Sequence, residues 1–282
     1  MTASTERTGP NETGGRAAWV AWAEQREMSV AGPAGNLALV DFQPVTGTPA
    51  AVPGMPAEVW RNPEEAGVRV RPLGPGLELA DADPREWAPV AEETFVERLG
   101  ANGAPLLRAG TRTADAFSLD GSDYELRLYD TNSEKLATFA GIERYDFDPG
   151  WRIAGTLNVF AETAQVPWAF TRSTDAGHTK TVPGTISVEI AGEAYEFAAF
   201  ADGGQLVLVF ADGTTGRESY APGRFLRFDP PAASGDRVEL DFNRAFIPPC
   251  GFSDFYSCPI PPAENRVSAP VRAGEQRVLW KD

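Results

Sequence analysis

The chain has 282 residues, which is long enough to bury a substantial core in one large domain or two smaller ones. Its formal net charge of -15 argues against a nucleic-acid partner and against an anionic membrane surface, because both are bound by clustered Lys and Arg. No stretch approaches the roughly 20 apolar residues that span a bilayer, and the first residues contain no apolar signal region. We therefore expect a soluble, cytoplasmic protein with no membrane association.

The N-terminal residues divide into a polar tail and a helix. Residues 1–15 are rich in Thr, Glu, Gly and Asn, so they cannot offset their ordering entropy and are predicted to be a disordered tail. Trp19, Trp22 and Arg26 fall at helical spacing and Gly32 with Pro33 ends the run, which predicts a helix from about 16 to 30. Trp19 and Trp22 share one face and are expected to pack this helix onto a sheet.

The chain from residue 37 to residue 160 reads as strands and turns. Short apolar or alternating runs, separated by Gly and Pro, predict strands near 37–42, 68–70, 77–79, 124–128, 145 and 152–160. Residues 92–99 fit either a short helix or a strand. Residues 161 to about 183 read as a long loop, which is a candidate lid or a disordered connection. This loop holds His178, the only histidine, whose Thr, Asp, Gly and Lys neighbours favour a solvated side chain.

Residues 186–210 give the clearest pattern. Apolar and polar residues alternate over 186–190, which predicts a first strand. Residues 195–200 and 206–210 are predicted to form two further strands, with turns at Gly192 and at Gly203-Gly204. This pattern predicts an antiparallel meander. Together with the many Gly and Pro residues, it predicts a mainly antiparallel β fold, a barrel or sandwich with one N-terminal helix and a Pro-rich C-terminal segment packed across an end. We expect residues 16–282 to form a single mainly-β domain.

Residues 212–275 concentrate the polar and ionisable groups. In 237–243, Val238, Leu240 and Phe242 share the core face, so Asp241 and Asn243 are neighbours on the opposite one. Arg224 falls on the same face as two apolar residues, which predicts a partly buried guanidinium that needs a carboxylate partner. The candidate partners are Asp241, Glu218 and Glu264.

Both cysteines, Cys250 and Cys258, lie in the same stretch with seven residues between them. Cytoplasmic reductants keep thiols reduced, so buried thiols are expected rather than a disulfide. A closed zinc site needs four N or S ligands, and these two thiols with one distant His178 cannot supply them. A mixed site with Asp or Glu and a nucleophilic cysteine are weaker alternatives. The Pro-rich segment itself is either a plug that closes the fold or the wall of a ligand site.

The same stretch resembles the family known as domain of unknown function 1684. Members carry D-x-T-x-G-x-E-x-Y-x-x-G-R, then L-D-F-N-R-A-Y-N-P-P-C, then C-P-x-P-P-x-E-N and A-G-E. The chain matches these segments with Asp212, Thr214, Gly216, Glu218, Tyr220, Gly223, Arg224, Leu240, Asp241, Phe242, Asn243, Arg244, Ala245, Pro248, Pro249, Cys250, Cys258, Pro259, Pro261, Pro262, Glu264, Asn265, Ala273, Gly274 and Glu275. It departs from them with Phe246 in place of Tyr and Ile247 in place of Asn. Weaker similarity in GNLALV, LRLYD and FAGIERYDFDPGW extends the expected resemblance over nearly the whole chain.

Two functions fit these observations. The first is a small-molecule enzyme whose catalytic carboxylate is one of Glu218, Asp241 and Glu264, and whose ligand-binding side chains are Tyr220, Arg224, Asn243, Asn265 and His178. The chain lacks G-x-S-x-G, G-x-x-x-x-G-K and G-x-G-x-x-G motifs, which argues against a Ser hydrolase, a P-loop NTPase and a Rossmann dehydrogenase. No nucleotide or nicotinamide cofactor, no other cofactor and no metal is expected. The second is a non-catalytic ligand-binding or scaffold protein in which the same groups form a structural salt-bridge network. On this reasoning, replacing Glu218 with Gln lowers stability only in the second case.

Overall fold

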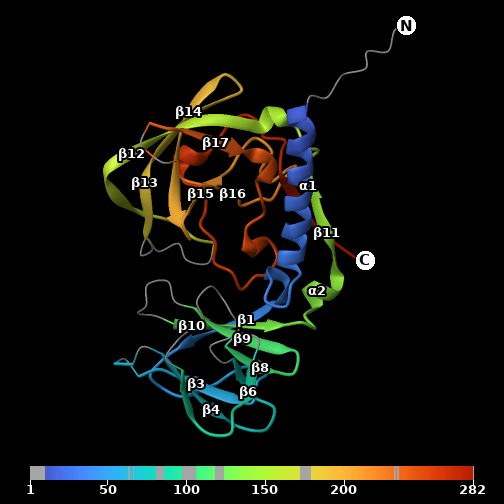
Figure 1. Ribbon diagram of the computed structural model, residues 1–282, viewed down its shortest axis with the longest axis vertical. Helices are drawn as coiled ribbons and strands as arrows, with labels where there is room; N and C mark the ends of the chain where they lie inside the picture. The colour runs from blue at the N-terminus through green and yellow to red at the C-terminus, as the bar shows by residue number, and fades with distance from the viewer. Residues whose placement is uncertain are drawn as a thin grey trace. The chain divides into compact units, whose positions relative to one another are not determined.

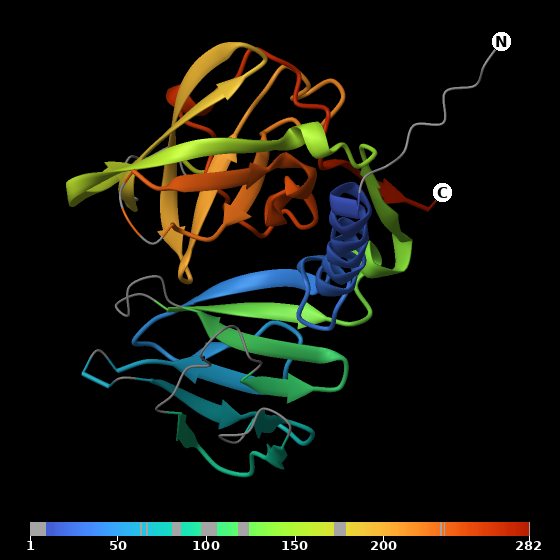
Figure 2. The same cartoon turned by 45° about the horizontal axis from the view of Figure 1, so that its top comes forward.

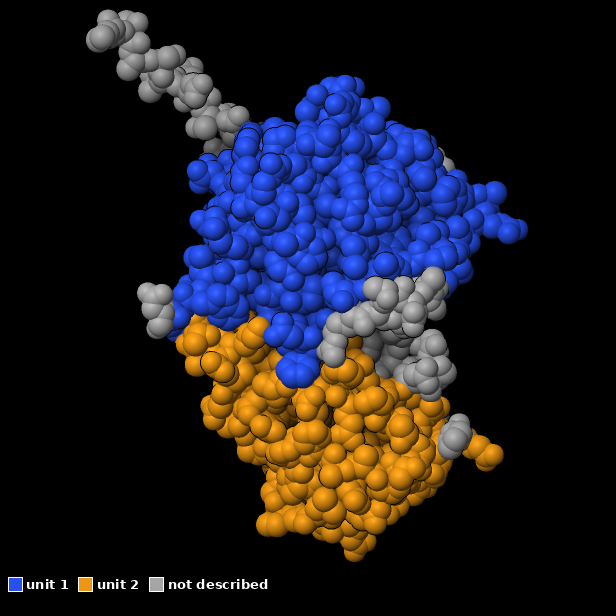
Figure 3. All heavy atoms as spheres, turned by 180° about the vertical axis from the view of Figure 1, so that it is seen from behind, with its two compact units in different colours: residues 1–27, 139–282 blue, residues 28–138 orange. Residues whose placement is uncertain are grey.

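The computed structural model describes residues 10–62, 64–65, 67–80, 86–96, 106–117, 124–171, 179–231, 233 and 235–281. By their contacts the residues group into two compact units. Unit 1 comprises residues 1–27 and 139–282, and unit 2 comprises residues 28–138 (Figure 3). The expectation of a single mainly-β domain over residues 16–282 stays a prediction.

The fold is mainly antiparallel β, with a half-barrel and one long N-terminal helix, as the sequence predicts (Figures 1 and 2). The helix, α1, spans Pro10–Val30 and so begins six residues before the predicted start. Proline suits the first turn of a helix because its missing N–H has no intrahelical acceptor there. The tail prediction is therefore wrong for residues 10–15, and residues 1–9 lie outside the described part of the chain.

Unit 2 contains two antiparallel sheets. One has the order β1-β10-β9-β8-β5-β6 and the other β2-β3-β4-β7. Their bounds are β1 Leu39–Val45, β2 Ala50–Ala51, β3 Ala57–Trp60, β4 Val68–Pro72, β5 Glu78–Ala80, β6 Trp87–Pro89, β7 Thr94–Val96, β8 Leu107–Ala109, β9 Arg112–Phe117 and β10 Tyr124–Asp130. The helices η1 (Asn36–Ala38) and α2 (Glu134–Thr138) flank them. The ambiguous run at 92–99 is thus strand over Thr94–Val96, and residues 97–99 lie outside the described part.

One core joins the two sheets of unit 2. Val59 and Val70 from the smaller sheet cluster with Leu107, Leu126 and Leu128 from the larger one, and all five are at most 1% exposed. Apolar residues at every second position of a strand produce this arrangement, because alternate side chains point to the same face. Unit 2 is therefore a small β-sandwich.

Unit 1 is built on a six-stranded antiparallel sheet, ordered β16-β15-β14-β13-β12-β17, that curves into a half-barrel (Figure 1). A separate ribbon pairs β11 with β18. The bounds are β11 Phe139–Arg144, β12 Arg152–Pro167, β13 Thr179–Ile190, β14 Glu193–Asp202, β15 Gln205–Phe210, β16 Arg224–Phe228, β17 Arg237–Asp241 and β18 Glu275–Trp280. Its described residues also form the short 3-10 helices η2 Pro149–Trp151, η3 Phe242–Arg244, η4 Pro249–Gly251 and η5 Ala263–Asn265.

The long loop predicted over residues 161–183 is mostly strand. β12 continues to Pro167 and β13 begins at Thr179, so only residues 168–178 connect them. The pairing register shifts between Val159 and Ala164, and such a bulge interrupts the alternation by which strands are recognised in a sequence. Residues 172–178, including His178, lie outside the described part of the chain, so the lid stays a prediction for them.

The predicted meander over 186–210 is confirmed, because β13, β14 and β15 pair in sequence with antiparallel register. Both faces of this sheet are buried. Leu208 and Phe210 of β15 belong to the core inside the half-barrel, whereas Val207 and Val209 face a second cluster. That second cluster also contains Trp168, Cys258 and the flanking aromatic residues of the Pro-rich segment. The Pro-rich segment therefore covers the outer side of the meander.

Helix α1 is tied to unit 1 by one of the predicted tryptophans and by an arginine. The Trp19 Nε1 donates to the carbonyl oxygen of Asn243 at 2.9 Å, and its ring lies 6.1 Å from that of Phe147. Arg26 donates to the carbonyl oxygen of Ile247 at 2.8 Å and lies over the rings of two phenylalanines, at 4.9 Å from Phe246 and 5.3 Å from Phe252. Trp19 is thus a packing anchor, but its contacts are to η3 and to the chain before η2 rather than to a sheet as predicted.

Candidate functional site

Arg224 is the centre of the polar stretch, and it is more deeply buried than predicted. It opens β16 with its side chain fully enclosed, over the ring of Phe210 at 5.3 Å. Nη2 donates to Asp212 Oδ2 and to the carbonyl oxygen of Val271, both at 2.8 Å. Nη1 donates to the carbonyl oxygens of Ala273 and Glu275, the latter at 3.2 Å. The guanidinium is thus surrounded by one carboxylate and three peptide carbonyls.

The carboxylate partner of Arg224 is Asp212, so the prediction of Asp241, Glu218 or Glu264 is wrong. Asp212 follows β15 and its side chain is fully buried. Its second oxygen, Oδ1, accepts from the backbone N–H of Thr214 at 2.7 Å and of Val271 at 3.2 Å. We call Arg224, Asp212 and the carbonyls of residues 271, 273 and 275 the Arg224 network. It fastens the irregular segment before β18 to the half-barrel.

Two glycines of the family pattern allow this close approach. Gly223 precedes Arg224 with φ +112°, and a Cβ there would lie 2.6 Å from both the carbonyl oxygen of Phe210 and the ring of Pro261. Gly274, within the 271–275 segment, has φ +77°, and a Cβ would collide with the carbonyl oxygen of Ala245. Side chains at these positions would push the segments apart.

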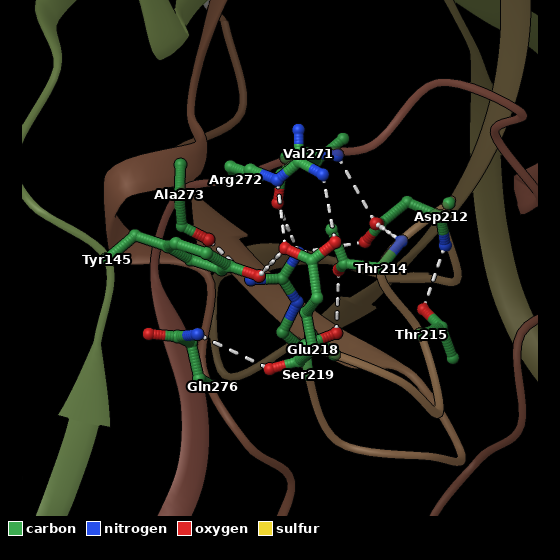
Figure 4. Close-up of polar contacts among 12 residues, drawn as sticks. Tyr145, Asp212, Thr214, Thr215, Glu218, Ser219, Val271, Arg272, Ala273 and Gln276 are labelled. Carbon is green, nitrogen blue, oxygen red and sulfur yellow. Dashed lines mark hydrogen bonds and ion pairs between the residues drawn. The ribbon is translucent and has the colours of Figure 1, made fainter.

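Glu218 lies at the surface rather than against Arg224. Figure 4 shows its carboxylate pointing toward Arg272 and the Tyr145 hydroxyl. Arg272 donates from Nε at 2.8 Å and from Nη2 at 2.9 Å, and Tyr145 donates at 3.3 Å. The Arg272 hydrogen bond is the main cause that lowers the pKa of Glu218. Burial, followed by the negative charge of Glu218, raises the pKa of Tyr145. A carboxylate with a lowered pKa is a weaker base, so this arrangement does not favour proton abstraction by Glu218.

Asp241 and Asn243 are neighbours, as predicted, but they do not share an open surface. β17 ends at Asp241 and the chain turns into η3, which leaves Asn243 1% exposed. Asn243 Nδ2 donates to Asp241 Oδ1 and to the carbonyl oxygen of Asp148, both at 2.9 Å, and its Oδ1 accepts from the N–H of Asp148 at 3.0 Å. Asn243 therefore joins η3 to the chain before η2.

Glu264 and Asn265 are adjacent in η5 but lie in opposite environments. Glu264 is exposed, whereas Asn265 is fully buried. The Asn265 side chain accepts from the N–H of Ala198 and donates to the carbonyl oxygens of Ala198 and Val209, all at 2.8 Å. It therefore bridges β14 and β15, and its functional groups are directed into the sheet rather than toward a ligand.

A second buried carboxylate, Glu275, escaped the sequence predictions although the A-G-E segment contains it. Its side chain is fully buried between Arg26 Nε at 3.3 Å and Arg144 Nη2 at 3.4 Å, and it accepts from the N–H of Ile247 at 2.8 Å. Burial, only partly offset by Glu275, lowers the pKa of Arg26. Because Glu275 binds the main chain of Ile247, the missing family Asn at that position leaves this contact intact.

Tyr220 belongs to a different cluster, with the two cysteines. Its hydroxyl donates to Cys250 Sγ at 3.7 Å, and the N–H of Cys250 donates to Cys258 Sγ at 3.3 Å. Neither cysteine forms a disulfide.

The structure thus divides the described candidates among separate positions: the Arg224 network, the surface pair of Glu218, the η3 turn, the β14–β15 bridge and the thiol cluster. Within the described residues no three His, Cys, Asp or Glu side chains converge as a metal site requires.

An open pocket of about 710 Å³ lies elsewhere in unit 1, and none of the predicted site residues lines it. It is formed on β12, β13 and β14 and beside β17. Its charged and hydroxyl-bearing lining residues are Thr156, Ser187, Glu189, Tyr195, Glu196 and Arg237. Asn158 donates to Ser187 Oγ at 2.8 Å, and Ser187 in turn donates to Glu196 at 3.5 Å, so a polar row crosses three strands.

The fold and these contacts define a half-barrel β protein whose C-terminal segment is held by a buried arginine. By sequence the chain belongs to the DUF1684 family, a protein family of unknown function, and the match covers residues 137–276. The weaker similarity in GNLALV and LRLYD falls outside the matched residues. Every element of the Arg224 network falls inside them.

One solved structure that the chain is similar to is the solution NMR structure of an uncharacterized protein from Haloarcula marismortui. The two share 35% sequence identity over 49% of this chain and 77% of that one, with a TM-score of 0.41. No curated protein matches the chain. Within the described residues, no helix has the length and apolar character to cross a membrane.

Proposed function

We propose that this chain is a non-catalytic small-molecule-binding protein, in which the family residues around Arg224 hold the half-barrel together. One observation carries the proposal: the Arg224 guanidinium is closed to solvent, and its two terminal nitrogens already bind Asp212 and three carbonyls. A substrate anion would have to displace Asp212, which leaves a buried carboxylate without its counter-charge.

The three candidate carboxylates also support a structural function. Glu218 is held by Arg272 in two hydrogen bonds, Asp241 caps η3, and Glu264 is exposed in η5. Among the described residues, no hydrogen bond or ion pair joins any two of them. General acid and base catalysis needs such groups around one reacting atom, and this distribution does not provide that arrangement.

The ligand site in this proposal is the open pocket on β12, β13 and β14. Its volume falls in the range of small-molecule sites, roughly 300–1,000 Å³. The lining of the pocket contains two negatively charged side chains, Glu189 and Glu196, and one positively charged side chain, Arg237. The chain as a whole has a formal net charge of -15. We therefore infer a small polar ligand with a positively charged group, because the negative potential of the pocket and the protein would attract it. The proposal includes a cytoplasmic location, in keeping with two cysteines that remain thiols.

The test is a thermal-unfolding screen with putrescine, choline and arginine as probes. A probe at about 100 times its Kd should raise the Tm by roughly 5 °C. Glu196→Gln should abolish that rise, whereas the matched variant Glu143→Gln, on β11 away from the pocket, should keep it. No shift with any of the three probes, or a shift that survives Glu196→Gln, would contradict the proposed ligand site.

A further inference from the structure

The two cysteines form a pair of thiols that lies outside the proposed ligand site. Cys250 lies in η4 and Cys258 lies where the Pro-rich segment meets the second core. The N–H of Cys250 donates to Cys258 Sγ at 3.3 Å. The sulfur of Cys258 therefore lies beside the backbone of Cys250, although seven residues separate the two in the sequence.

The surroundings of Cys250 favour its thiolate. The Tyr220 hydroxyl donates a hydrogen bond to its sulfur at 3.7 Å. The Cys258 hydrogen bond is the main cause that lowers the pKa of Cys250, and it outweighs the opposing effect of burial. Burial and the nearby Cys250 raise the pKa of Tyr220, so that hydroxyl keeps its proton and remains a donor. Thiolates, rather than thiols, attack disulfides.

The two sulfurs also differ in access. Cys250 is half-buried, whereas Cys258 is 4% exposed and packed beside Trp168 and Phe200. The backbone N–H of Cys258 donates to Thr171 Oγ1 at 3.0 Å, which fixes its position beside the chain that follows β12. An external reagent therefore reaches Cys250 first, and the buried Cys258 is available for the second step.

We propose that Cys250 and Cys258 are a redox modification site that low-molecular-weight disulfides oxidise, with Cys250 as the attacking sulfur and Cys258 as the resolving one. The Cys250 thiolate attacks one sulfur of the reagent, its S–S bond breaks, and one thiolate leaves. Cys258 then gives up its proton and attacks the Cys250 sulfur, which breaks the mixed disulfide and releases the second thiolate. Both leaving thiolates take up protons, so the protein loses two hydrogens and the reagent gains two.

This bond would change the segment that carries it. It closes a small ring over residues 250–258 and removes the thiolate that the Tyr220 hydroxyl faces. By loop-closure entropy the oxidised form should unfold about 5 °C higher than the reduced form. Oxidation would thus stiffen the Pro-rich cover of the meander.

The experiment treats the full chain with oxidised glutathione, blocks remaining thiols by alkylation, and measures the intact mass and the linked peptides. The wild type should lose two hydrogens, resist alkylation and yield one peptide pair joined through Cys250 and Cys258, and dithiothreitol should reverse this. Cys258→Ser should stop at a single glutathione adduct on Cys250. Cys250→Ser should react at least about tenfold more slowly, because the buried Cys258 thiol is then the remaining target.

Tyr220→Phe provides a readout that a purely structural effect would not change. Loss of the hydroxyl should raise the apparent pKa in the pH profile of the first step, and raising the pH should restore the wild-type rate. The proposal is overturned if wild-type protein keeps two alkylatable thiols, or if both single cysteine variants form adducts at equal rates. Should Cys258→Ser fail to fold, the linked-peptide map of the wild type alone decides between one disulfide and two separate adducts.

Discussion

Unit 1 and unit 2 use charged side chains in opposite ways. In unit 2 the ion pairs lie on the solvent side of neighbouring strands, as in Arg108 with Glu78 at 2.7 Å, where both side chains are about one-third exposed. Unit 1 instead buries Arg224 and Glu275 completely. Sheets satisfy their own backbone, whereas the irregular 242–275 segment of unit 1 does not, so its carbonyls and N–H groups need side-chain partners. In unit 1, the buried side chains of the family motif therefore supply main-chain hydrogen bonds that a sheet would otherwise provide.

Asp115 is the exception in unit 2. It is 2% exposed on β9, the Tyr129 hydroxyl reaches Oδ2 only at 3.5 Å, and Oδ1 has no hydrogen-bond partner among the described residues. Burial, partly offset by the charge of Arg127, raises the pKa of Asp115 to about 6. Unit 2 therefore carries an incompletely satisfied buried carboxylate, in contrast to Asp212 of unit 1.

The largest effect is expected from breaking the Arg224 network. Asp212→Ala removes the only side-chain carboxylate that pairs with Arg224 in the described structure, and leaving a buried charge unpaired should lower the free energy of unfolding by about 3–5 kcal/mol. Denaturant unfolding, followed by a probe in unit 1, measures this loss. Asp202→Asn is the matched control, because its pair with Arg227 is about half exposed, and it should be neutral. Equal effects of the two substitutions would remove the distinction between buried and surface pairs.

In unit 2, the substitution Asp115→Asn is expected to raise the free energy of unfolding, by less than Asp212→Ala lowers it in unit 1. Asp115 loses its proton near pH 3.8 when unfolded but near pH 6 when folded, so the folded state binds more protons between these values. Stability should therefore fall as pH rises from about 4 to 6, and Asp115→Asn should restore up to about 3 kcal/mol at pH 7. The same substitution should change nothing below pH 4. A flat pH profile for wild-type unit 2 would show that the carboxylate finds a partner in solution.

The smallest effect is expected for Glu218→Gln. Its pair with Arg272 is exposed, so the change in unfolding free energy at neutral pH should stay within the error of a denaturation experiment. The lowered pKa of Glu218 makes its contribution present above the ordinary glutamate pKa and lost as the pH falls through the folded value. A large loss of stability at pH 7 would instead place Glu218 in the buried network.

Alternation along strands predicted the parts of this structure that depend on local pattern. It placed Val238, Leu240 and Phe242 in the core and Arg224 on an inward face, and the structure confirms both. The partner of Arg224 could not be obtained in this way, because Asp212 reaches it across a turn and the other acceptors are carbonyls of residues 271–275. Backbone acceptors carry no side-chain signature in a sequence.

Irregular elements explain the remaining differences between the predicted and the observed structure. The bulge after Val159 hides the second half of β12, and η3 turns Asn243 inward where continued alternation would leave it on the surface. The early start of α1 had a readable signal, because Pro10 is a favoured first helical residue, but the polar composition of residues 1–15 outweighed it. The thiol contact depended on how the Pro-rich segment folds back, which spacing alone does not specify.

The central claim is that Arg224 is bound within the protein and not available to a ligand. Nuclear magnetic resonance of the arginine side chains tests it most directly, through exchange of the Nη hydrogens with solvent. The Arg224 Nη hydrogens should exchange at least about 100-fold more slowly than those of an exposed arginine such as Arg277. Added phosphate or acetate should leave the chemical shifts of the Arg224 signals unchanged. Rapid exchange at Arg224, or signals that move on addition of either anion, would contradict it.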